Sequence, residues 1–283
     1  IKWRPRIFFR CLIFLIPEIS LSQQKNVVLI MADDLGYECI GANGCEDYLT
    51  PVLDQLAIDG VRFDNCFAQP LCTPSRVKMM TGRYNVRNYV DFGRLDRDET
   101  TFGNIFKEAG YATAIAGKWQ LGDEMDSPQH FGFDESCLWQ HYRANLKDDG
   151  VTDSRYSQPW LEINGVATNY GEGYFGPDVC TDFLCDFIEA NTNEPFLAYF
   201  PMILTHNPFV PTPDSPEWDP SDPGSTTNLG DPQYFKDMVE YMDVLVGQIL
   251  DCLATNNLLD DTVVIFTGDN GTHEAITTGW NGT

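Results

Sequence analysis

The chain has 283 residues, of which 43% are hydrophobic and 13% aromatic, and its formal net charge at pH 7 is −24. This hydrophobic content is typical of a globular protein with a substantial core and excludes a disordered chain. The negative charge argues against a nucleic-acid partner and against an anionic membrane surface. The length fits one large domain or two small ones.

The first 22 residues have the pattern of an export signal. A basic start precedes a short apolar core at residues 11–16 and a small-x-small cleavage site at residues 20–22. The apolar core is too short to cross a bilayer, and no other stretch of the sequence is long and apolar enough to do so. We therefore expect a signal peptide over 1–22 and an exported mature protein, periplasmic or extracellular, without a membrane anchor.

Apolar patterning predicts strands that alternate with helices. Four short apolar runs have the continuous character of strands covered on both faces: 27–31, 112–116, 196–200 and 263–267. Helical periodicity lies between them, at 102–109, 179–188 and 235–253. This order predicts an α/β fold with a mainly parallel central sheet flanked by helices. We interpret residues 202–233 as a long ordered loop over the site, and residues 123–176 as insertions that shape a pocket.

Nine cysteines occur without a Cys-x-x-Cys pair, so the spacing of a zinc site is absent. In an exported protein some of them are expected to form disulfides, and Cys39 with Cys45 are the nearest loop candidates. The sequence leaves the connectivity open.

Oxygen-bearing side chains follow two of the predicted strands. Asp33-Asp34 come directly after the first strand, and Asp269-Asn270 come after the last. Each pair alone is more typical of a turn or a helix cap. Equivalent positions at the ends of two parallel strands instead favour a shared cation, because adjacent carboxylates repel each other without one. Oxygen ligands favour Ca²⁺ or Mg²⁺ over zinc or copper.

A second unusual stretch is Cys72-Thr73-Pro74-Ser75-Arg76, followed by Thr81-Gly82. Proline is well tolerated at the start of a helix, so a helix is predicted to open after Pro74, with Cys72 just ahead of it. Backbone N–H groups and the Arg76 guanidinium would both suit an anion beside Cys72. The alternative interpretation is a buried free cysteine before an ordinary helix.

These residues closely resemble the signature of the type I sulfatases, formylglycine-dependent enzymes of the alkaline-phosphatase superfamily. Residues 26–36 are similar to the family's first strand with its two metal aspartates, and residues 267–271 to its second metal segment. The resemblance implies a Ca²⁺ ion, with Mg²⁺ less favoured, held by Asp33, Asp34, Asp269, Asn270 and the oxidised side chain at Cys72. It also implies that a formylglycine-generating enzyme converts Cys72 to Cα-formylglycine during maturation.

The resemblance extends to three further positions. Lys118, in Gly117-Lys118-Trp119-Gln120-Leu121-Gly122, matches a family lysine that binds sulfate. His206, before Pro208, matches a sulfate-contacting histidine. The chain departs from the family at Gln120, where a histidine is usual that helps to regenerate the aldehyde. Glutamine can form a hydrogen bond but cannot take up a proton near neutral pH.

The implied function is hydrolysis of a sulfate monoester, most readily one on a carbohydrate. In the implied mechanism the hydrated formylglycine at position 72 attacks sulfur, while Arg76, Lys118 and His206 neutralise the sulfate oxygens and His206 protonates the leaving alcohol. The sulfatase catalytic domain is expected to occupy residues 23–283. A further active-site lysine and a small C-terminal sheet domain of the family have no counterpart in these 283 residues.

Two alternatives stay open at this point. One is a phosphomonoesterase or phosphodiesterase of the same superfamily, although such enzymes usually carry Ser or Thr as nucleophile and histidine-rich zinc sites. The other is a catalytically impaired relative that binds sulfated glycans, for which Gln120 is the evidence.

Overall fold

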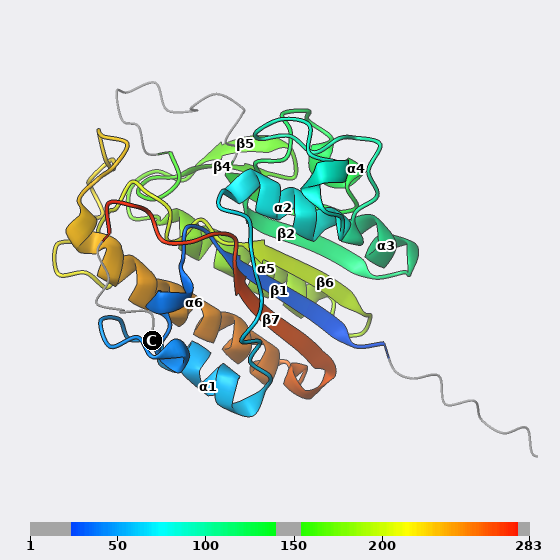
Figure 1. The fold of residues 1–283 in the computed structure, drawn as a ribbon, viewed down its shortest axis with the longest axis horizontal. Coiled ribbons are helices and arrows are strands. Elements are labelled where there is room, and N and C mark those ends of the chain that lie inside the picture. The colour runs from blue at the N-terminus through cyan, green and yellow to red at the C-terminus, as the bar shows by residue number, and fades with distance from the viewer. Residues whose placement is uncertain (1–23, 140–153, 277–283) are drawn as a thin grey trace, which may run out of the picture.

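The computed structural model describes residues 24–139 and 154–276. The expected signal peptide lies outside these residues. A single seven-stranded sheet runs through the molecule in the order β5-β4-β3-β2-β6-β1-β7 (Figure 1). The strands are β1 (Asn26–Ala32), β2 (Ala112–Lys118), β3 (Glu135–Trp139), β4 (Trp160–Ile163), β5 (Val166–Asn169), β6 (Phe196–Pro201) and β7 (Thr262–Gly268). The four predicted strands are β1, β2, β6 and β7, and all four are confirmed.

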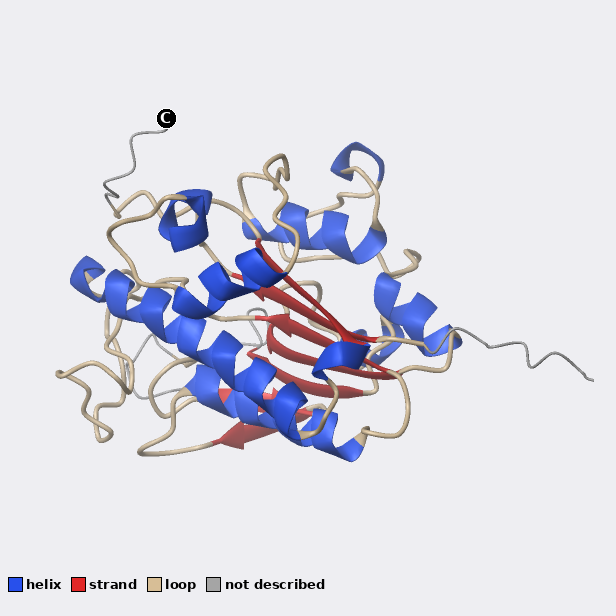
Figure 2. Ribbon diagram, turned by 90° about the horizontal axis from the view of Figure 1, so that it is seen from below, coloured by secondary structure: helices blue, strands red, loops and turns tan. Residues whose placement is uncertain are grey.

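Helices pack on both faces of the sheet, as Figure 2 shows from below. They are α1 (Pro51–Asp59), α2 (Cys72–Thr81), α3 (Phe102–Glu108), α4 (Ser127–His130), α5 (Gly176–Ala190) and α6 (Phe235–Thr255), with short 3₁₀ turns at Tyr37–Cys39, Gly41–Asn43, Asn85–Arg87, Pro232–Tyr234 and Leu259–Asp261. The helices predicted over 102–109, 179–188 and 235–253 correspond to α3, α5 and α6. None of the helices in the described part of the chain has the length and apolar character needed to cross a membrane.

Alternation along the strands divides the core into two layers. Val28 and Ile30 of β1 point to one face and join the cluster formed with α1, α5 and α6. Met31 points to the other face and packs with Val77 of α2 and Leu197 of β6. Since successive side chains of a strand alternate between faces, each face of β1 needs its own apolar layer. The mainly parallel α/β sandwich expected from the sequence is confirmed.

The interpretation of residues 123–176 as insertions is incomplete, because β3, β4 and β5 lie there. β3 pairs in parallel with β2, and β4 and β5 continue the sheet as an antiparallel hairpin. The hairpin turns at Asn164-Gly165, where both residues have positive φ angles of 49° and 83°. Asn-Gly between two strands is a strong hairpin signal. It was overlooked because the flanking strands have only four residues each.

Two local expectations need correction. Helix α2 begins at Cys72 itself, so Pro74 occupies its first turn, where a missing N–H costs no intrahelical bond. Cys39 and Cys45 are not paired, and every cysteine in the described residues is a free thiol. The Cys39 sulfur instead lies 3.3 Å from the Thr272 hydroxyl, and burial raises the pKa of the Cys39 thiol to about 12.

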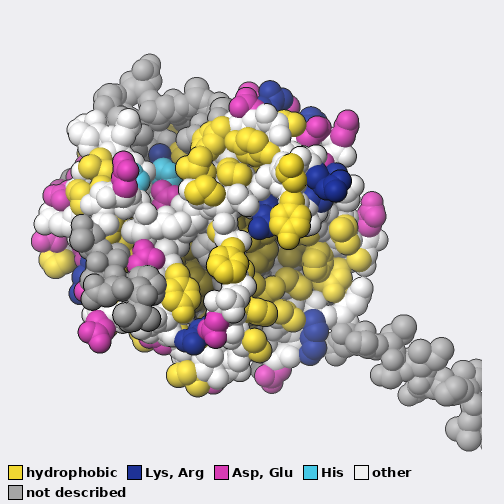
Figure 3. Space-filling view, in the orientation of Figure 1, with side chains coloured by type: hydrophobic (Ala, Val, Ile, Leu, Met, Phe, Trp, Pro, Cys, Tyr) yellow, Lys and Arg dark blue, Asp and Glu magenta, His cyan; other side chains and the backbone are white. Residues whose placement is uncertain are grey.

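The face that carries α2 and α3 is only partly covered at the β7 edge. Val263 and Ile265 of this edge strand are 47% and 45% exposed, and Phe63 in the segment before α2 is 75% exposed. In Figure 3 hydrophobic side chains gather in a hollow on this side of the molecule.

Candidate active site

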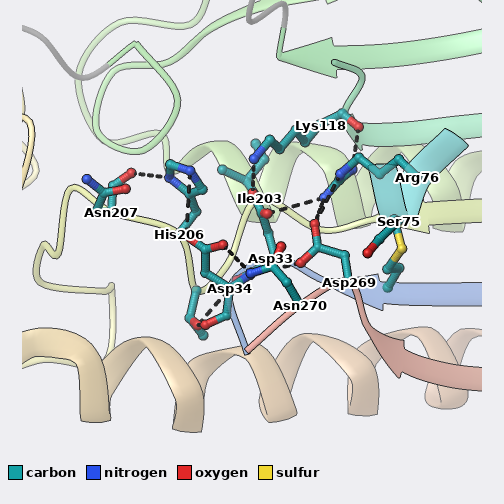
Figure 4. Close-up of polar contacts among 12 residues, drawn as sticks. Asp33, Asp34, Ser75, Arg76, Lys118, Ile203, His206, Asn207, Asp269 and Asn270 are labelled. Carbon is teal, nitrogen blue, oxygen red and sulfur yellow. Dashed lines mark hydrogen bonds and ion pairs between the residues drawn. The ribbon is translucent and has the colours of Figure 1, made fainter. Parts of the chain in front are cut away.

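The predicted site residues meet where the parallel strands end. Asp33-Asp34 follow β1, Asp269-Asn270 follow β7, and Lys118 is the last residue of β2. His206 follows β6, in the loop that was predicted to cover the site. Because β7, β1, β6 and β2 are neighbours in the sheet, their carboxyl ends lie at one edge. Figure 4 shows these side chains converging there.

Three carboxylates form the centre of the site. Ligand oxygens of Asp33, Asp34 and Asp269 all lie within 4.8 Å of one another. The Asp34 backbone N–H donates to Asp269 Oδ1 at 3.1 Å, and Asn270 Nδ2 donates to Asp34 Oδ1 at 2.6 Å. Asp33 and Asp269 are fully buried. Such a cluster is unfavourable without positive charge, because like charges at this distance repel strongly in a poorly solvated site.

Two buried cations supply part of that charge. Lys118 Nζ lies 2.6 Å from Asp33 Oδ2. Arg76 donates to Asp269 Oδ2 through Nε at 3.2 Å and Nη2 at 3.0 Å, and its Nη2 lies 3.4 Å from Asp33 Oδ1. Arg76 also donates to the Lys118 carbonyl at 3.0 Å, which joins α2 to the end of β2. Counted as ionised groups, three carboxylates and two cations leave one net negative charge.

Lys118 reaches this position because β2 passes very close to β6. A Cβ atom on Gly117 would lie 2.0 Å from the Pro201 carbonyl oxygen, and Gly117 has a φ angle of 121°. Only glycine tolerates both conditions. The Gly-Lys pair in the sequence is therefore required by the path of the backbone as well as by the charge of the lysine.

The neighbouring charges shift the pKa values of the three carboxyl groups in different directions. Burial alone would raise the pKa of Asp33, but the positive charges of Lys118 and Arg76 hold it well below its usual value. Burial and the neighbouring Asp33 raise the pKa of Asp269 to about 7, despite Arg76. The same two causes raise the pKa of Asp34. The protein's own cations thus compensate Asp33 far better than the other two acids.

The donor set fits a hard divalent cation. Asn270 Oδ1 is a buried oxygen without a hydrogen-bond partner, and Asp33 Oδ1 has no hydrogen bond beside its 3.4 Å ion pair with Arg76 Nη2. Unpaired buried oxygens are costly unless a ligand satisfies them. Carboxylate and amide oxygens are the ligands that Ca²⁺ and Mg²⁺ prefer.

Cys72 opens the helix that carries Arg76, so both residues come from the first turns of α2. Its side chain is 7% exposed. Burial raises the pKa of the Cys72 thiol, and the charges of Lys118, Asp33, Arg76 and Asp269 all act on it. The thiol is therefore protonated at neutral pH, and it lies within electrostatic range of the charged cluster.

His206 lies on the other side of the acids. Its Nε2 is 3.6 Å from Asp34 Oδ2. Nδ1 is 3.1 Å from Arg155 Nη1 and 2.6 Å from the Asn207 carbonyl. Burial, followed by the charge of Lys118, lowers the pKa of His206 to about 3. The imidazole is thus neutral at neutral pH.

Sequence reasoning missed Arg155, which lies in the segment without clear periodicity. Its guanidinium stacks 3.8 Å from the centre of the Trp139 ring and donates to the Asn207 carbonyl at 3.0 Å. Arg155 thereby joins the end of β3 to the loop of His206. An isolated arginine between two loops gives no pattern from which this contact could have been read.

Gln120 lies two residues after Lys118 and has an unusual backbone. It is 2% exposed with a φ angle of 52°, in the left-handed region that non-glycine residues rarely adopt. Its Oε1 is buried without a hydrogen-bond partner. Strained backbone and an unsatisfied polar atom together are typical of functional positions.

Comparison with known proteins identifies the family to which the chain belongs. The family model described as Sulfatase matches residues 25–276. Human arylsulfatase D is 28% identical over 98% of this chain and 60% of its own length, and human N-acetylgalactosamine-6-sulfatase is 29% identical over 88% of this chain and 50% of its own length. The solved structure of Ps i-CgsB in complex with k-i-k-neocarrahexaose is 25% identical, with a TM-score of 0.75 over 89% of this chain and 60% of that chain.

The chain spans about half to three fifths of the length of these relatives. Within that span the match covers the whole sheet and every strand end that contributes to the site. The chain belongs to the sulfatase family, within the alkaline-phosphatase superfamily.

Proposed function

We propose that this protein hydrolyses a sulfate monoester, with the nucleophile supplied by position 72. The observation that carries the proposal is the buried charge assembly: three carboxylates and Asn270 at two strand ends, with Arg76 and Lys118 beside them and Cys72 at the start of α2. Each component was expected from the sequence.

The state of the Cys72 thiol supports its conversion to Cα-formylglycine. A thiol whose pKa is raised by burial is a poor nucleophile at neutral pH, since the thiolate is the reactive form. An aldehyde at this position, once hydrated, carries a hydroxyl group that can attack sulfur. A formylglycine-generating enzyme would have to act before or during folding, because the folded chain buries the side chain.

Asp33, Asp34, Asp269 and Asn270 would hold the divalent cation, for which Ca²⁺ is our first choice. Bound there, it would add positive charge beside position 72 and lower the cost of ionising a hydroxyl group at that position. The two positive charges would change the net charge of the cluster from one negative to one positive. That value complements a sulfate monoester, which carries one negative charge, better than a phosphate monoester dianion.

The protein's cations have the role of neutralising the transferred group. Arg76 and Lys118 are fixed by Asp33 and Asp269, so they need no reorganisation as negative charge develops on the sulfate oxygens. His206 was expected to protonate the leaving alcohol, but a neutral imidazole does not have that proton to give. With a pKa of about 3, it serves as a neutral hydrogen-bonding group toward sulfate, and protonation of the leaving alcohol falls to water or another donor.

The substrate that we propose is a sulfated carbohydrate. Two of the relatives are named for, or were solved with, a sugar: N-acetylgalactosamine-6-sulfatase and Ps i-CgsB with k-i-k-neocarrahexaose. We further propose that the protein is exported, as the pattern of its first 22 residues indicates.

One observation favours a second candidate, a relative that binds sulfated glycans without turning them over. Gln120 stands where the resemblance predicts a proton-accepting histidine, and a glutamine cannot take that proton. The phosphoesterase alternative is disfavoured for two reasons. The net charge of the cation-loaded cluster, one positive, matches a sulfate monoester better than a phosphate monoester dianion. The metal ligands are all oxygen atoms, which favour Ca²⁺ or Mg²⁺ over zinc.

Mass spectrometry of the peptide that contains Cys72 tests the proposal directly. Formylglycine would make this peptide about 18 Da lighter than the cysteine form. The matching activity assay compares 4-nitrophenyl sulfate with 4-nitrophenyl phosphate, using Cys72→Ala as the control. Turnover of the sulfate ester by the wild-type protein alone supports the proposal. A modified Cys72 with phosphate as the better substrate, or sulfate turnover retained in Cys72→Ala, would overturn it.

A further inference from the structure

A small surface pocket lies next to the start of α2, which contains Cys72, and next to the loop that follows Lys118. It has a volume of about 280 Å³ and is lined by Asp91, Phe92, Gly93, Arg94 and Asp123. No role in the proposed chemistry uses any of these five residues. Drug-sized ligands occupy pockets of about 300–1,000 Å³, so this one suits a single ring.

Both walls of the pocket are attached to the proposed active site. Residues 91–94 form a tight turn, closed by an antiparallel bridge between Asp91 and Arg94. Its Gly93 N–H donates to the hydroxyl of Thr73 at 3.0 Å, and Thr73 directly follows Cys72. This bond is buried, so the turn is held against the start of α2.

The other wall belongs to the loop that leaves β2. Asp123 lies five residues after Lys118 and three after Gln120. The Leu95 N–H donates to the Leu121 carbonyl at 3.1 Å, which ties this loop to the turn at residues 91–94. A group esterified to a sulfate between Cys72 and Lys118 would therefore have the pocket beside it.

The lining side chains have the chemistry of a sugar subsite. Phe92 is 36% exposed and offers part of an aromatic ring as an apolar platform. The carboxylates of Asp91 and Asp123 accept hydrogen bonds from hydroxyl groups. Arg94 has a side chain that is 56% exposed, and its Nη2 lies 3.7 Å from Glu124 Oε1. This long and exposed ion pair is weak enough for Arg94 to take an anionic group instead.

We propose that this pocket binds a sugar ring of a sulfated oligosaccharide, the ring that carries the scissile ester or its neighbour. Phe92 lies against one face of the ring, Asp91 and Asp123 accept its hydroxyl groups, and Arg94 binds an anionic substituent. This inference rests on the proposed function for the position of the ester. It adds the residues that distinguish an oligosaccharide from a small aryl sulfate.

Kinetics on two substrate classes test the subsite. We expect Phe92→Ala and Arg94→Gln each to lower kcat/KM for sulfated hexasaccharides, prepared from carrageenan and from glycosaminoglycans, about tenfold more than for 4-nitrophenyl sulfate, chiefly through KM. Matched controls are Phe63→Ala and Arg62→Gln, which remove the same side chains from an exposed segment outside the pocket. Equal losses on both substrate classes, or no loss on either, would overturn the subsite.

Calorimetric titration of Cys72→Ala with the same hexasaccharides separates the two proposals. Binding that weakens about tenfold when Phe92→Ala or Arg94→Gln is added supports the subsite, even if no sulfate ester is turned over and the proposed function fails. A wild-type protein that hydrolyses 4-nitrophenyl sulfate, but whose Cys72→Ala form binds no hexasaccharide of the set, keeps the function and refutes the subsite.

Discussion

The Nζ atom of Lys118 lies 2.6 Å from Oδ2 of Asp33, and neither side chain is accessible to solvent. This ion pair joins the ends of β2 and β1, which are separated in the sheet by β6. It explains how a chain with three clustered carboxylates folds around them: the strongest acid of the group has a permanent counter-ion. The site is therefore a structural element of the sheet edge as well as a place for chemistry.

Removal of the Lys118 charge should destabilise the fold strongly. In Lys118→Met the buried carboxylate of Asp33 keeps only the longer contact to Arg76, and breaking a buried pair in this way costs about 3–5 kcal/mol. Urea unfolding followed by circular dichroism measures the change. Lys107→Met is the matched control, since Lys107 pairs with Asp134 at the surface and its loss should change stability little. Similar midpoints for the two variants would refute the structural role of Lys118.

Calcium should stabilise the protein through the three carboxylates and Asn270. A ligand that binds only the folded state adds about 2.7 kcal/mol at a free concentration one hundred times its Kd. We expect Tm to rise with calcium after treatment with EDTA, and to rise less with magnesium. Asp34→Asn should abolish most of this rise. Asp126→Asn, at an exposed pair with Arg97, should retain it. An equal calcium effect in both variants would place the ion elsewhere.

A third prediction concerns stability against pH at the start of α5. Burial raises the pKa of Asp178 to about 6, although Tyr241 Oη donates to its carboxylate at 2.7 Å. The folded state therefore holds a proton that the unfolded chain has lost, because an unfolded aspartate titrates near pH 4. The contribution of Asp178 is fully present below that value and is lost as the pH rises through about 6.

Asp178→Asn keeps an oxygen that accepts the Tyr241 bond and removes the titration. We expect the Tm of the variant, relative to that of the wild type, to rise between pH 4 and pH 7 and then to stay constant. Asp186→Asn, an exposed position on the same helix, is the control. A Tm difference for Asp178→Asn that does not change with pH would contradict the assignment.

The sequence was sufficient for the site residues that lie at strand ends. Apolar runs identify β1, β2, β6 and β7, and parallel pairing then places Asp33, Lys118 and Asp269 at one edge without further information. Arg155 could not be placed in this way, because its contacts with Trp139 and His206 depend on the path of irregular loops. The neutral state of His206 was also inaccessible, since its cause is burial next to Lys118, which only the folded chain creates.

Gln120 gives the sharpest test of how the nucleophile is regenerated. The residue is buried and has a left-handed backbone with φ of 52°, a conformation in which histidine is several-fold more frequent than most residues. Gln120→His should therefore fold, and it introduces a group that can accept a proton near neutral pH. We expect kcat for 4-nitrophenyl sulfate to rise about a hundredfold, the lower end of the range attributed to a positioned general base.

The pH profile distinguishes that effect from a change in packing. In Gln120→His the rate should acquire a new ionisation near the usual histidine pKa of about 6.5, with activity falling below it. Gln120→Asn is the control, because it keeps an amide of the same chemistry and should add no ionisation. If kcat increases but its pH dependence shows no new ionisation, the imidazole acts through packing and not as a proton acceptor. No increase at all would mean that regeneration of the nucleophile does not limit turnover in this protein.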